Sequence, residues 1–584
     1  MTQTVPLPPN EPLVRTEVID LGAPLEARDR FGRLFGAWTC YFLASPGVLF
    51  ADGSAFLAVL GAFLWSLTVI RPPGSKSAKQ RKAFLIEWGA ACYGFALPMI
   101  WIWYVIPFGF LYPGIGQGLY AAVSGLIARR VARRSGPVLG AFCGFVALEF
   151  LRSILVTPFG LGWLRVGHCG LDAWRGILPF AGLEGATVVV AAVAAAGVGL
   201  VARQRHSVAL RAAAILSVVG LVVGRFLPAT PAPTLEGQTL STLSVQPAFT
   251  QERKMRNDAQ ANFEAQRQLT LDALAREAAQ GRQVDLVLWG ESMLFVMLVT
   301  DEAMQAARAG FAAPDWDPLM SFENNPKEMS RQLASWERPV VHEGLLEFLP
   351  EGTAFLSGAE AYDDVDDELR RRNSIALWNP GPDREPLVAK GILVPFAETM
   401  YGFERYAWAR NLVKSLAGYV PDFAAAEGQG ILELDRGGAD PIRIGASVCF
   451  DNAFPRAYMD VGGEAGVGMF VVVSNEAWYR NAFEMDQMVA FTRALALMTG
   501  KPFCRATNSG VTVAFDGAGR ELGRLEVDGK DRGVPGTLFC ELPIVADPTR
   551  RSTYEVARTS LRVLLGLGLV LALLLKRRIV PEAS

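Results

Sequence analysis

Three side chains that together could carry out acyl transfer each follow a strand-like run in the second half of the chain. Glu291 follows VDLVLWG, Lys390 follows PLVA and Cys449 follows IRIGASV. Catalytic groups in α/β folds gather at strand ends, where loops expose side chains on a rigid frame. Each residue alone is more often structural, as a turn acid, a surface lysine or a small buried side chain. Their joint occurrence favours chemistry.

A cysteine thiolate is a nucleophile, and a nearby base must take the thiol proton. Histidine is the usual base, but residues 231–553 contain only His342. A carboxylate can replace it where burial raises the carboxylate pKa, and Glu291 fits that role. Lys390 can stabilise the thiolate and then a tetrahedral oxyanion. Glu398, eight residues further on, can orient the lysine or help to move protons.

An α/β domain over residues 231–553 must position these groups, because strand-like and helix-like segments alternate there. One run, Val284–Trp289, is continuously apolar, as in a strand buried on both faces. The predicted strands are Thr242–Gln246, Val284–Trp289, Ala354–Ala361, Ser374–Trp378, Ile442–Cys449, Met469–Ser474, Phe503–Phe515 and Thr537–Leu542, and the predicted helices are Asp258–Gln280 and Asp486–Met498. The irregular, charged segment Phe311–Val341 is long for a loop and is predicted to be a lid or a functional insertion.

Apolar residues are concentrated at the two ends of the chain. Of the 584 residues 51% are apolar and 20% are charged, against an average of about 25% charged. Eight apolar stretches approach the roughly 20 residues that a membrane-spanning helix needs. They are Phe35–Ala51, Ala55–Ile70, Phe84–Phe108, Leu111–Ile127, Val138–Leu155, Leu178–Val201, Val208–Leu227 and Leu561–Leu575.

Clusters of arginine and lysine between alternate stretches predict the orientation. Basic residues gather near residues 71–82, 129–134, 203–211 and 576–578. The positive-inside rule makes these regions cytoplasmic, so residues 231–553 lie on the outer face. The predicted organisation is a cytoplasmic segment (1–30), a membrane domain of about seven helices (31–230), a periplasmic domain (231–553) and a final transmembrane helix with a short tail (554–584). Because the first 30 residues are polar, they are not a cleavable signal peptide.

Composition argues against several other classes of protein. The net charge of −2 argues against nucleic acid as a partner. Three histidines argue against a multi-histidine metal centre, and we expect neither a metal nor a cofactor. Seven cysteines are too few for a disulfide scaffold, and Cys504 and Cys540 are expected to face a core from strand positions. His168 is expected to be ordinary polar surface.

Several long motifs in one order resemble the nitrilase superfamily and, within it, the apolipoprotein N-acyltransferases. The resemblance runs over most of the chain. KGILVPFAE (390–398) is close to the family's K-x-x-L-V-P-F-G-E segment. The other matching segments are LVLWGES (286–292), SVCFDNAFP (447–455), SNEAWY (474–479), TRALALMTGKPFCRATNSGVT (492–512) and, in the membrane part, LEFLRSILVTPFGLGW (148–163).

The resemblance implies an α-β-β-α sandwich next to a multi-span helical domain in the bacterial inner membrane. It implies transfer of an acyl chain from a phospholipid to the N-terminal amine of a diacylglyceryl-cysteine lipoprotein. Cys449 would hold the thioester, Glu291 would be the general base and Lys390 would stabilise the oxyanions. Glu398, Phe450, Asp451, Asn475 and Trp478 are the implied supporting residues.

The match has departures that leave an alternative open. The family commonly has Tyr-Glu after the cysteine, where this chain has Phe450-Asp451. A membrane-anchored nitrilase-type hydrolase, or an acyltransferase with another amine acceptor, is therefore the second hypothesis. The third is an inactive homologue that binds lipids or lipoproteins without turnover. In the membrane part, Glu149 and Arg152 lie three residues apart and can pair on one helix face. Charges inside a span point to a functional role, with a structural ion pair as the alternative.

Overall fold

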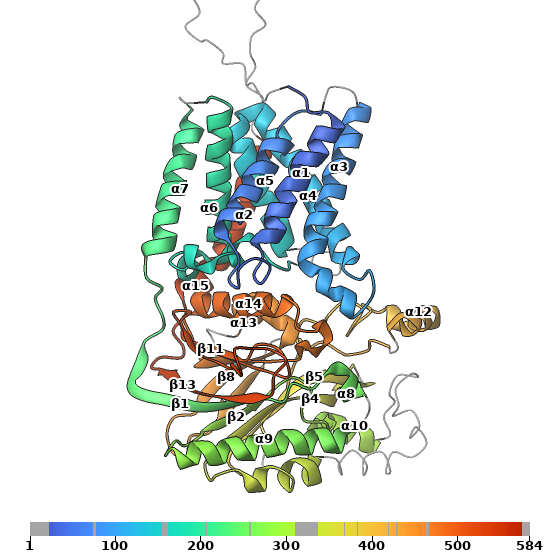
Figure 1. The fold of residues 1–584 in the computed structure, drawn as a ribbon, viewed down its shortest axis with the longest axis vertical. Coiled ribbons are helices and arrows are strands. Elements are labelled where there is room, and N and C mark those ends of the chain that lie inside the picture. The colour runs from blue at the N-terminus through green and yellow to red at the C-terminus, as the bar shows by residue number, and fades with distance from the viewer. Residues whose placement is uncertain are drawn as a thin grey trace, which may run out of the picture.

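The chain folds into a helical domain stacked on an α/β domain (Figure 1). The computed structural model describes residues 23–73, 77–154, 162–204, 207–255, 258–309, 337–366, 368–381, 384–417, 420–427, 430–459, 461 and 466–574. Most of the predicted lid segment, Phe311–Val341, lies outside these residues.

Each of the eight predicted apolar stretches overlaps a helix of the helical domain. These helices are α1 (Ala27–Ala44), α2 (Ala55–Val69), α3 (Ser77–Ala96) with the 3-10 helix η1 (Leu97–Tyr104), α4 (Leu111–Ser135), α5 (Pro137–Ile154), α6 (Leu178–Val201), α7 (Val208–Phe226) and α15 (Thr553–Leu574). Among the described residues, five helices are long and apolar enough to cross a membrane: α3 with η1, α5, α6, α7 and α15. Helix α2 has 15 residues, and α1 and α4 each carry several arginines at one end, which lowers their hydropathy.

Two sheets lie face to face in the α/β domain. The first has the strand order β13-β1-β2-β4-β5-β6, with β3 on β4, and the second has the order β12-β11-β10-β9-β8-β7. The strands are β1 (Thr234–Gln246), β2 (Leu286–Trp289), β3 (Leu298–Val299), β4 (Ala354–Val365), β5 (Glu368–Trp378), β6 (Val388–Ala389), β7 (Ile431–Leu434), β8 (Ile442–Val448), β9 (Met469–Ser474), β10 (Phe503–Thr507), β11 (Val513–Phe515), β12 (Glu521–Arg524) and β13 (Gly536–Val545).

One helical layer covers the outer face of each sheet. Helix α9 (Ala259–Ala279) packs on β1 and β13, and α14 (Glu484–Thr499) lies between the second sheet and the helical domain (Figure 1). Strand β2 shows how the layers form: Leu288 faces the core between the sheets, and Trp289 faces the core under α9. The nitrilase-like α-β-β-α sandwich predicted from the sequence is confirmed.

The predicted strands and helices are present, with ends shifted by a few residues. Strand β1 begins eight residues before the predicted Thr242, because its first half pairs with β13 across a bulge near Thr239. The predicted strand Phe503–Phe515 is instead an antiparallel hairpin of β10 and β11. Of the five residues between them, Asn508 to Gly510 form a bend against the ends of β1 and β2.

Candidate active site

The two sheets bring Glu291, Lys390 and Cys449, hereafter the candidate triad, to one buried place. Glu291 lies two residues after β2, Lys390 follows β6, and Cys449 opens the 3-10 helix η8 (Cys449–Ala453) directly after β8. All three side chains are buried, and Lys390 is only 1% exposed. Lys390 Nζ lies 3.7 Å from Glu291 Oε1 and 2.8 Å from Glu398 Oε1. The lysine ammonium therefore sits between two carboxylates.

Two glycines, Gly290 just after β2 and Gly358 within β4, allow the Glu291 backbone to lie tightly between the sheets. A Cβ on Gly290 would stand 2.8 Å from Asn508 N and 3.0 Å from Ser474 O. A Cβ on Gly358 of β4 would stand 2.6 Å from the Glu291 Cα. Real Cβ atoms do not come that close to backbone, so only glycine fits. This packing fixes the direction in which Glu291 enters the site.

Asn373 of β5 joins the two carboxylates. Its Nδ2 donates to Glu291 Oε1 at 2.7 Å and to Glu398 Oε1 at 3.1 Å. The other Glu398 oxygen accepts the Val394 N–H at 2.8 Å. Glu398 is thus held by its own loop and by Asn373, with its Oε1 2.8 Å from Lys390 Nζ. Sequence reasoning missed Asn373, because a single asparagine within a strand carries no pattern.

The Cys449 backbone has a left-handed conformation, with φ of +46°. Such a conformation is costly for a non-glycine residue and persists only when the surroundings hold it. Asp451 helps to stabilise this backbone conformation of Cys449. Its carboxylate accepts the Ile392 N–H at 2.7 Å and the Val448 N–H at 3.2 Å. The carboxylate therefore ties the turn that carries the cysteine to the loop that follows Lys390.

Burial governs the electrostatics of the site. It raises the pKa of Glu291 above its ordinary value, against the lowering effect of Lys390, and Glu398 raises it further. Burial alone would lower the pKa of Lys390, but Glu398 and Glu291 raise it above the usual range. Burial and Glu291 raise the pKa of the Cys449 thiol. The arrangement therefore holds a protonated thiol, a permanent cation and a carboxylate that binds protons readily.

Burial also raises the pKa of Asp451 to about 6, although the nearby Lys390 and the backbone N–H groups lower it.

A second lysine, Lys254 of helix α8 (Gln251–Met255), lies within electrostatic reach of Glu291. Burial lowers the Lys254 pKa to about 8, against the raising effects of Glu291 and Glu360. The sequence offered no signal for Lys254, since it lies in a polar helix far from the matched motifs.

Aromatic rings connect the site to the helical domain. Phe450 stacks on Trp163 with ring centroids 5.8 Å apart, and Trp101 of η1 contacts both Trp163 and Tyr479. Trp163 Nε1 donates to Gln487 Oε1 at 2.7 Å, and Gln487 Nε2 donates to the Pro98 carbonyl at 3.0 Å. The residue after the cysteine thus lies directly against the membrane part of the chain.

The predicted Glu149–Arg152 pair is present and almost fully buried on α5. Arg152 also donates to the Trp163 carbonyl at 2.7 Å, so the pair holds the segment that contacts Phe450. Glu149 Oε2 accepts the Val166 N–H at 3.1 Å. The pair is therefore an ion pair within the helical domain that holds the segment around Trp163 in place.

The other residues singled out in the sequence lie in turns, in strands or in the packed interior of the protein. Asn475 precedes the 3-10 helix η9 (Glu476–Tyr479), where its Oδ1 accepts from Asn508 Nδ2 at 2.9 Å, and Trp478 is half-buried on η9. The prediction that His168 is surface was wrong. It is buried against Phe491, and its Nδ1 accepts the Arg165 N–H at 3.0 Å. Cys504 and Cys540 are buried strand residues, as expected.

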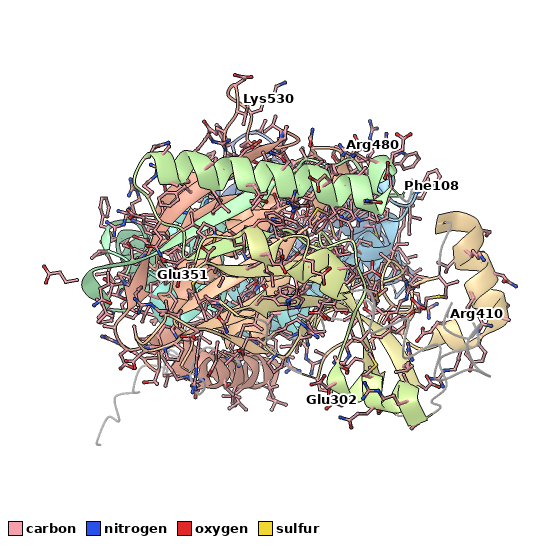
Figure 2. All side chains as sticks on the ribbon, turned by 90° about the horizontal axis from the view of Figure 1, so that it is seen from below. Phe108, Glu302, Glu351, Arg410, Arg480 and Lys530 are labelled. Atoms are coloured by element: carbon pink, nitrogen blue, oxygen red, sulfur yellow. The ribbon has the colours of Figure 1, made fainter. Side chains whose placement is uncertain are left out.

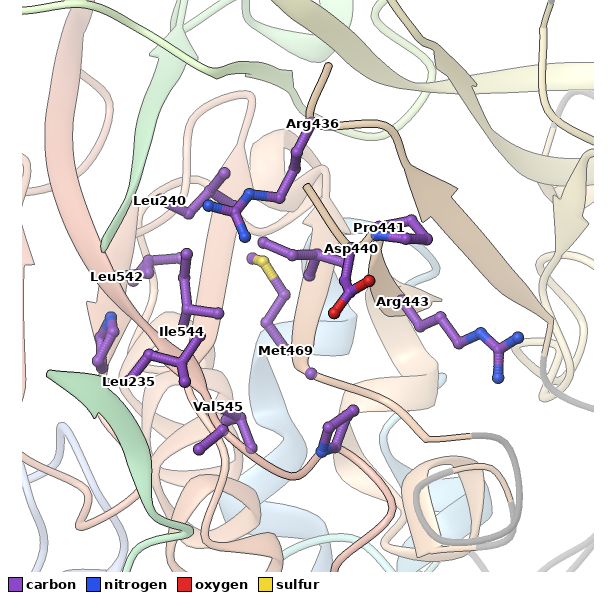
Figure 3. A pocket seen from close by; sticks show the side chains of 15 residues that line it. Leu235, Leu240, Arg436, Asp440, Pro441, Arg443, Met469, Leu542, Ile544 and Val545 are labelled. Carbon is purple, nitrogen blue, oxygen red and sulfur yellow. The ribbon is translucent and has the colours of Figure 1, made fainter. Parts of the chain in front are cut away.

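The α/β domain contains two cavities, one next to the loop that follows Lys390 and one at a different place in the domain. One of about 580 Å³ borders the Lys390 loop at Gly391 and Leu393 and is walled by charged residues such as Arg372 and Glu404. A smaller one of about 140 Å³ lies near the ends of β1 and β13, beside Met469 (Figure 3). Neither cavity is lined by Glu291, Lys390 or Cys449.

Residues 253–530 match the family of carbon-nitrogen hydrolases. A protein of Geobacter metallireducens named apolipoprotein N-acyltransferase is 25% identical over 69% of this chain and 69% of its own length. The proteins of that name from Allorhizobium ampelinum and Pseudomonas putida are 25% and 24% identical, over 87% and 81% of this chain and 91% and 87% of their own lengths. Residues 253–530 therefore form a carbon-nitrogen hydrolase domain of the nitrilase superfamily, in a chain that is similar over much of its length to apolipoprotein N-acyltransferases.

Proposed function

We propose that this chain transfers an acyl chain from a phospholipid to the N-terminal amine of a diacylglyceryl-cysteine lipoprotein, through a thioester on Cys449. An acyltransferase role in lipoprotein N-acylation follows from the similarity to the named relatives. The donor, the thioester and the residue roles are our proposal. The observation that carries it is the buried contact between the cysteine turn, the Lys390–Glu291 pair and the aromatic wall of the helical domain.

In the first half of the reaction, Cys449 Sγ attacks the ester carbonyl of the phospholipid while Glu291 takes the thiol proton. We assign the stabilisation of the tetrahedral oxyanion to Lys390, a buried cation 3.7 Å from Glu291 Oε1, because a charge held away from bulk water stabilises an oxyanion strongly. The C–O ester bond then breaks. Glu291 returns the proton to the leaving alkoxide, and the products are a lysophospholipid and the Cys449 thioester.

In the second half, the neutral amine of the acceptor attacks the thioester carbonyl and Glu291 removes an amine proton. The C–S bond breaks and the Cys449 thiolate recovers that proton, so the enzyme returns to its starting state. The raised pKa of Glu291 suits this work, since the group must accept and release a proton twice in one cycle.

The position of the site fits membrane-bound substrates. Phe450 and Tyr479 contact tryptophans of the helical domain, so the candidate triad lies at the junction of the two domains. A lipid ester in the adjacent leaflet can reach such a site without crossing the aqueous phase. We further propose that the chain lies in the bacterial inner membrane with the α/β domain on the periplasmic side.

Mass spectrometry tests the chemistry. The full-length protein is incubated with a phospholipid and a synthetic diacylglyceryl-cysteine peptide. The proposal expects an acyl adduct on Cys449 and a peptide that gains one acyl group. Cys449→Ala should lose both, while Cys504→Ala, at another buried cysteine of the same domain, should keep both. An adduct with an unchanged peptide would point to a different acceptor, and no adduct at all would contradict the thioester.

Labelling of introduced cysteines tests the orientation. Lys530 is exposed on the α/β domain (Figure 2), and Gln80 is exposed at the far end of the helical domain. In spheroplasts, a membrane-impermeant maleimide should label Lys530→Cys, and it should label Gln80→Cys only after lysis. The reverse pattern would overturn the proposed topology.

A further inference from the structure

A cavity lined by arginines lies at the end of the helical domain that faces away from the α/β domain. It encloses about 490 Å³, within the range of small-molecule sites. Its described lining is Pro73, Gln80, Leu126, Arg129, Arg130, Arg133 and Arg134, so no described lining residue is a carboxylate. Gly136, just beyond α4, lies near Gln204 in the connection from α6 to α7. Because α7 ends at the α/β domain, this connection marks the opposite end of the helical domain (Figure 1).

The cavity carries an excess of positive charge. Glu87 Oε1 accepts from Arg129 at 2.5 Å and from Arg30 at 2.7 Å, so one carboxylate serves two guanidinium groups. Arg130 and Arg133 are exposed and form no ion pair with any described residue. The guanidinium groups of Arg130 and Arg133 are suited to the oxygens of a phosphate, which a guanidinium can bind through paired hydrogen bonds.

An apolar stripe on α4 leads to these arginines. Ile115, Leu119 and Leu126 are 50%, 40% and 46% exposed. They are spaced by four and seven residues, so they share one face of the helix, and Arg130 and Arg133 continue the same face four and seven residues after Leu126. A ligand that matches this surface has a long apolar tail and an anionic head. Free phosphate would use only the arginines.

We propose that this cavity binds the phosphate group of an anionic phospholipid, with an acyl chain lying along the exposed stripe of α4. The site is separate from the candidate triad, because it lies at the other end of the helical domain. The lipid bound here is a resident lipid that holds the ends of α3 and α4 together, and it is not a substrate.

Native mass spectrometry of the full-length protein in detergent tests the proposal. The probes are dioleoyl phosphatidylglycerol, which is anionic, and dioleoyl phosphatidylcholine, which has the same tails and no net charge. The wild-type protein should retain the anionic lipid preferentially. The double variant Arg130→Gln/Arg133→Gln should bind it about 25-fold more weakly, from roughly fivefold for each arginine.

The matched control is Arg211→Gln, which removes an exposed arginine at the same end of the domain but outside the cavity. It should leave the affinity unchanged. The variant Arg130→Lys/Arg133→Lys keeps the charge but loses the paired donors, and it should fall between wild type and the glutamine pair. Equal lipid retention by wild type and the glutamine pair, with both folded by thermal unfolding, would overturn the proposal.

A competition experiment separates the two sources of phosphate. Inorganic phosphate at millimolar concentration should not displace the anionic lipid, because it cannot use the apolar stripe. Displacement by phosphate, or no preference between the two lipids, would overturn the assignment to a lipid.

Discussion

Removing Asn373 should change the pH dependence of the reaction in a defined direction. The Nδ2 group donates at 2.7 Å to Glu291 and at 3.1 Å to Glu398, and both acceptors are carboxylates. A hydrogen bond to a charged group contributes about 1.5–3 kcal/mol, and one pKa unit is about 1.4 kcal/mol. Because this bond stabilises the ionised form of Glu291, Asn373→Ala should raise the Glu291 pKa by about 1–2 units.

The sign follows from the proposed role of Glu291. A general base is active when deprotonated, so activity rises with pH through the Glu291 pKa. In Asn373→Ala this acidic limb should therefore move to higher pH by about 1–2 units. The assay is acyl transfer to the diacylglyceryl peptide, with kcat/KM followed against pH.

The matched control is Asn379→Ala. Asn379 lies just beyond the same strand, and its Nδ2 donates to the Glu433 carbonyl at 2.9 Å, away from the candidate triad. Its acidic limb should stay in place. If Asn373→Ala lowers activity equally at every pH and leaves the limb unmoved, the argument that Asn373 sets the protonation of Glu291 is wrong.

Three further predictions concern the same site. Glu398→Gln removes an anion that raises the Glu291 pKa, so the acidic limb of kcat/KM should move to lower pH, and a shift to higher pH would contradict the electrostatic account. Gly290→Ala places a Cβ 2.8 Å from the Asn508 N, so it should lower the free energy of unfolding by about 1–3 kcal/mol. Thermal unfolding measures this change. An unchanged Tm would mean that the sheets separate more easily than the packing indicates. Trp163→Leu removes the stack on Phe450 and one hydrogen bond, so kcat/KM for a phospholipid donor should fall about tenfold. An unchanged kcat/KM would mean that the aromatic contact between the two domains has no role in the use of the donor.

Most of the fold could be predicted from the sequence, because its patterns are local. The continuous apolar run of β2 predicts a strand buried on both faces, and the structure places Leu288 and Trp289 in different cores. The sequence predicts one strand over Phe503–Phe515, where the structure has the two strands β10 and β11, because the short bend at Asn508 to Gly510 separates two runs of similar composition.

The candidate catalytic residues and their places along the chain follow from local sequence patterns. Glu291, Lys390 and Cys449 follow strands, and strand ends are a local property of the pattern. How those strand ends meet depends on the three-dimensional fold. Residues far apart in sequence become neighbours only through the pairing of strands and the packing of sheets, which local composition does not encode.

The clearest cases are the residues without a motif. Asn373 matters because β5 pairs with β6, which Lys390 follows, and because its side chain donates to Glu291, which follows β2 on the other side of β4. His168 looked like a loop histidine, yet packing of α14 against the helical domain buries it on Phe491. In the sequence the arginines of α4 indicate only topology, and the packing of α3 beside α4 shows that they line a cavity. In each case the function of the side chain depends on its neighbours in space.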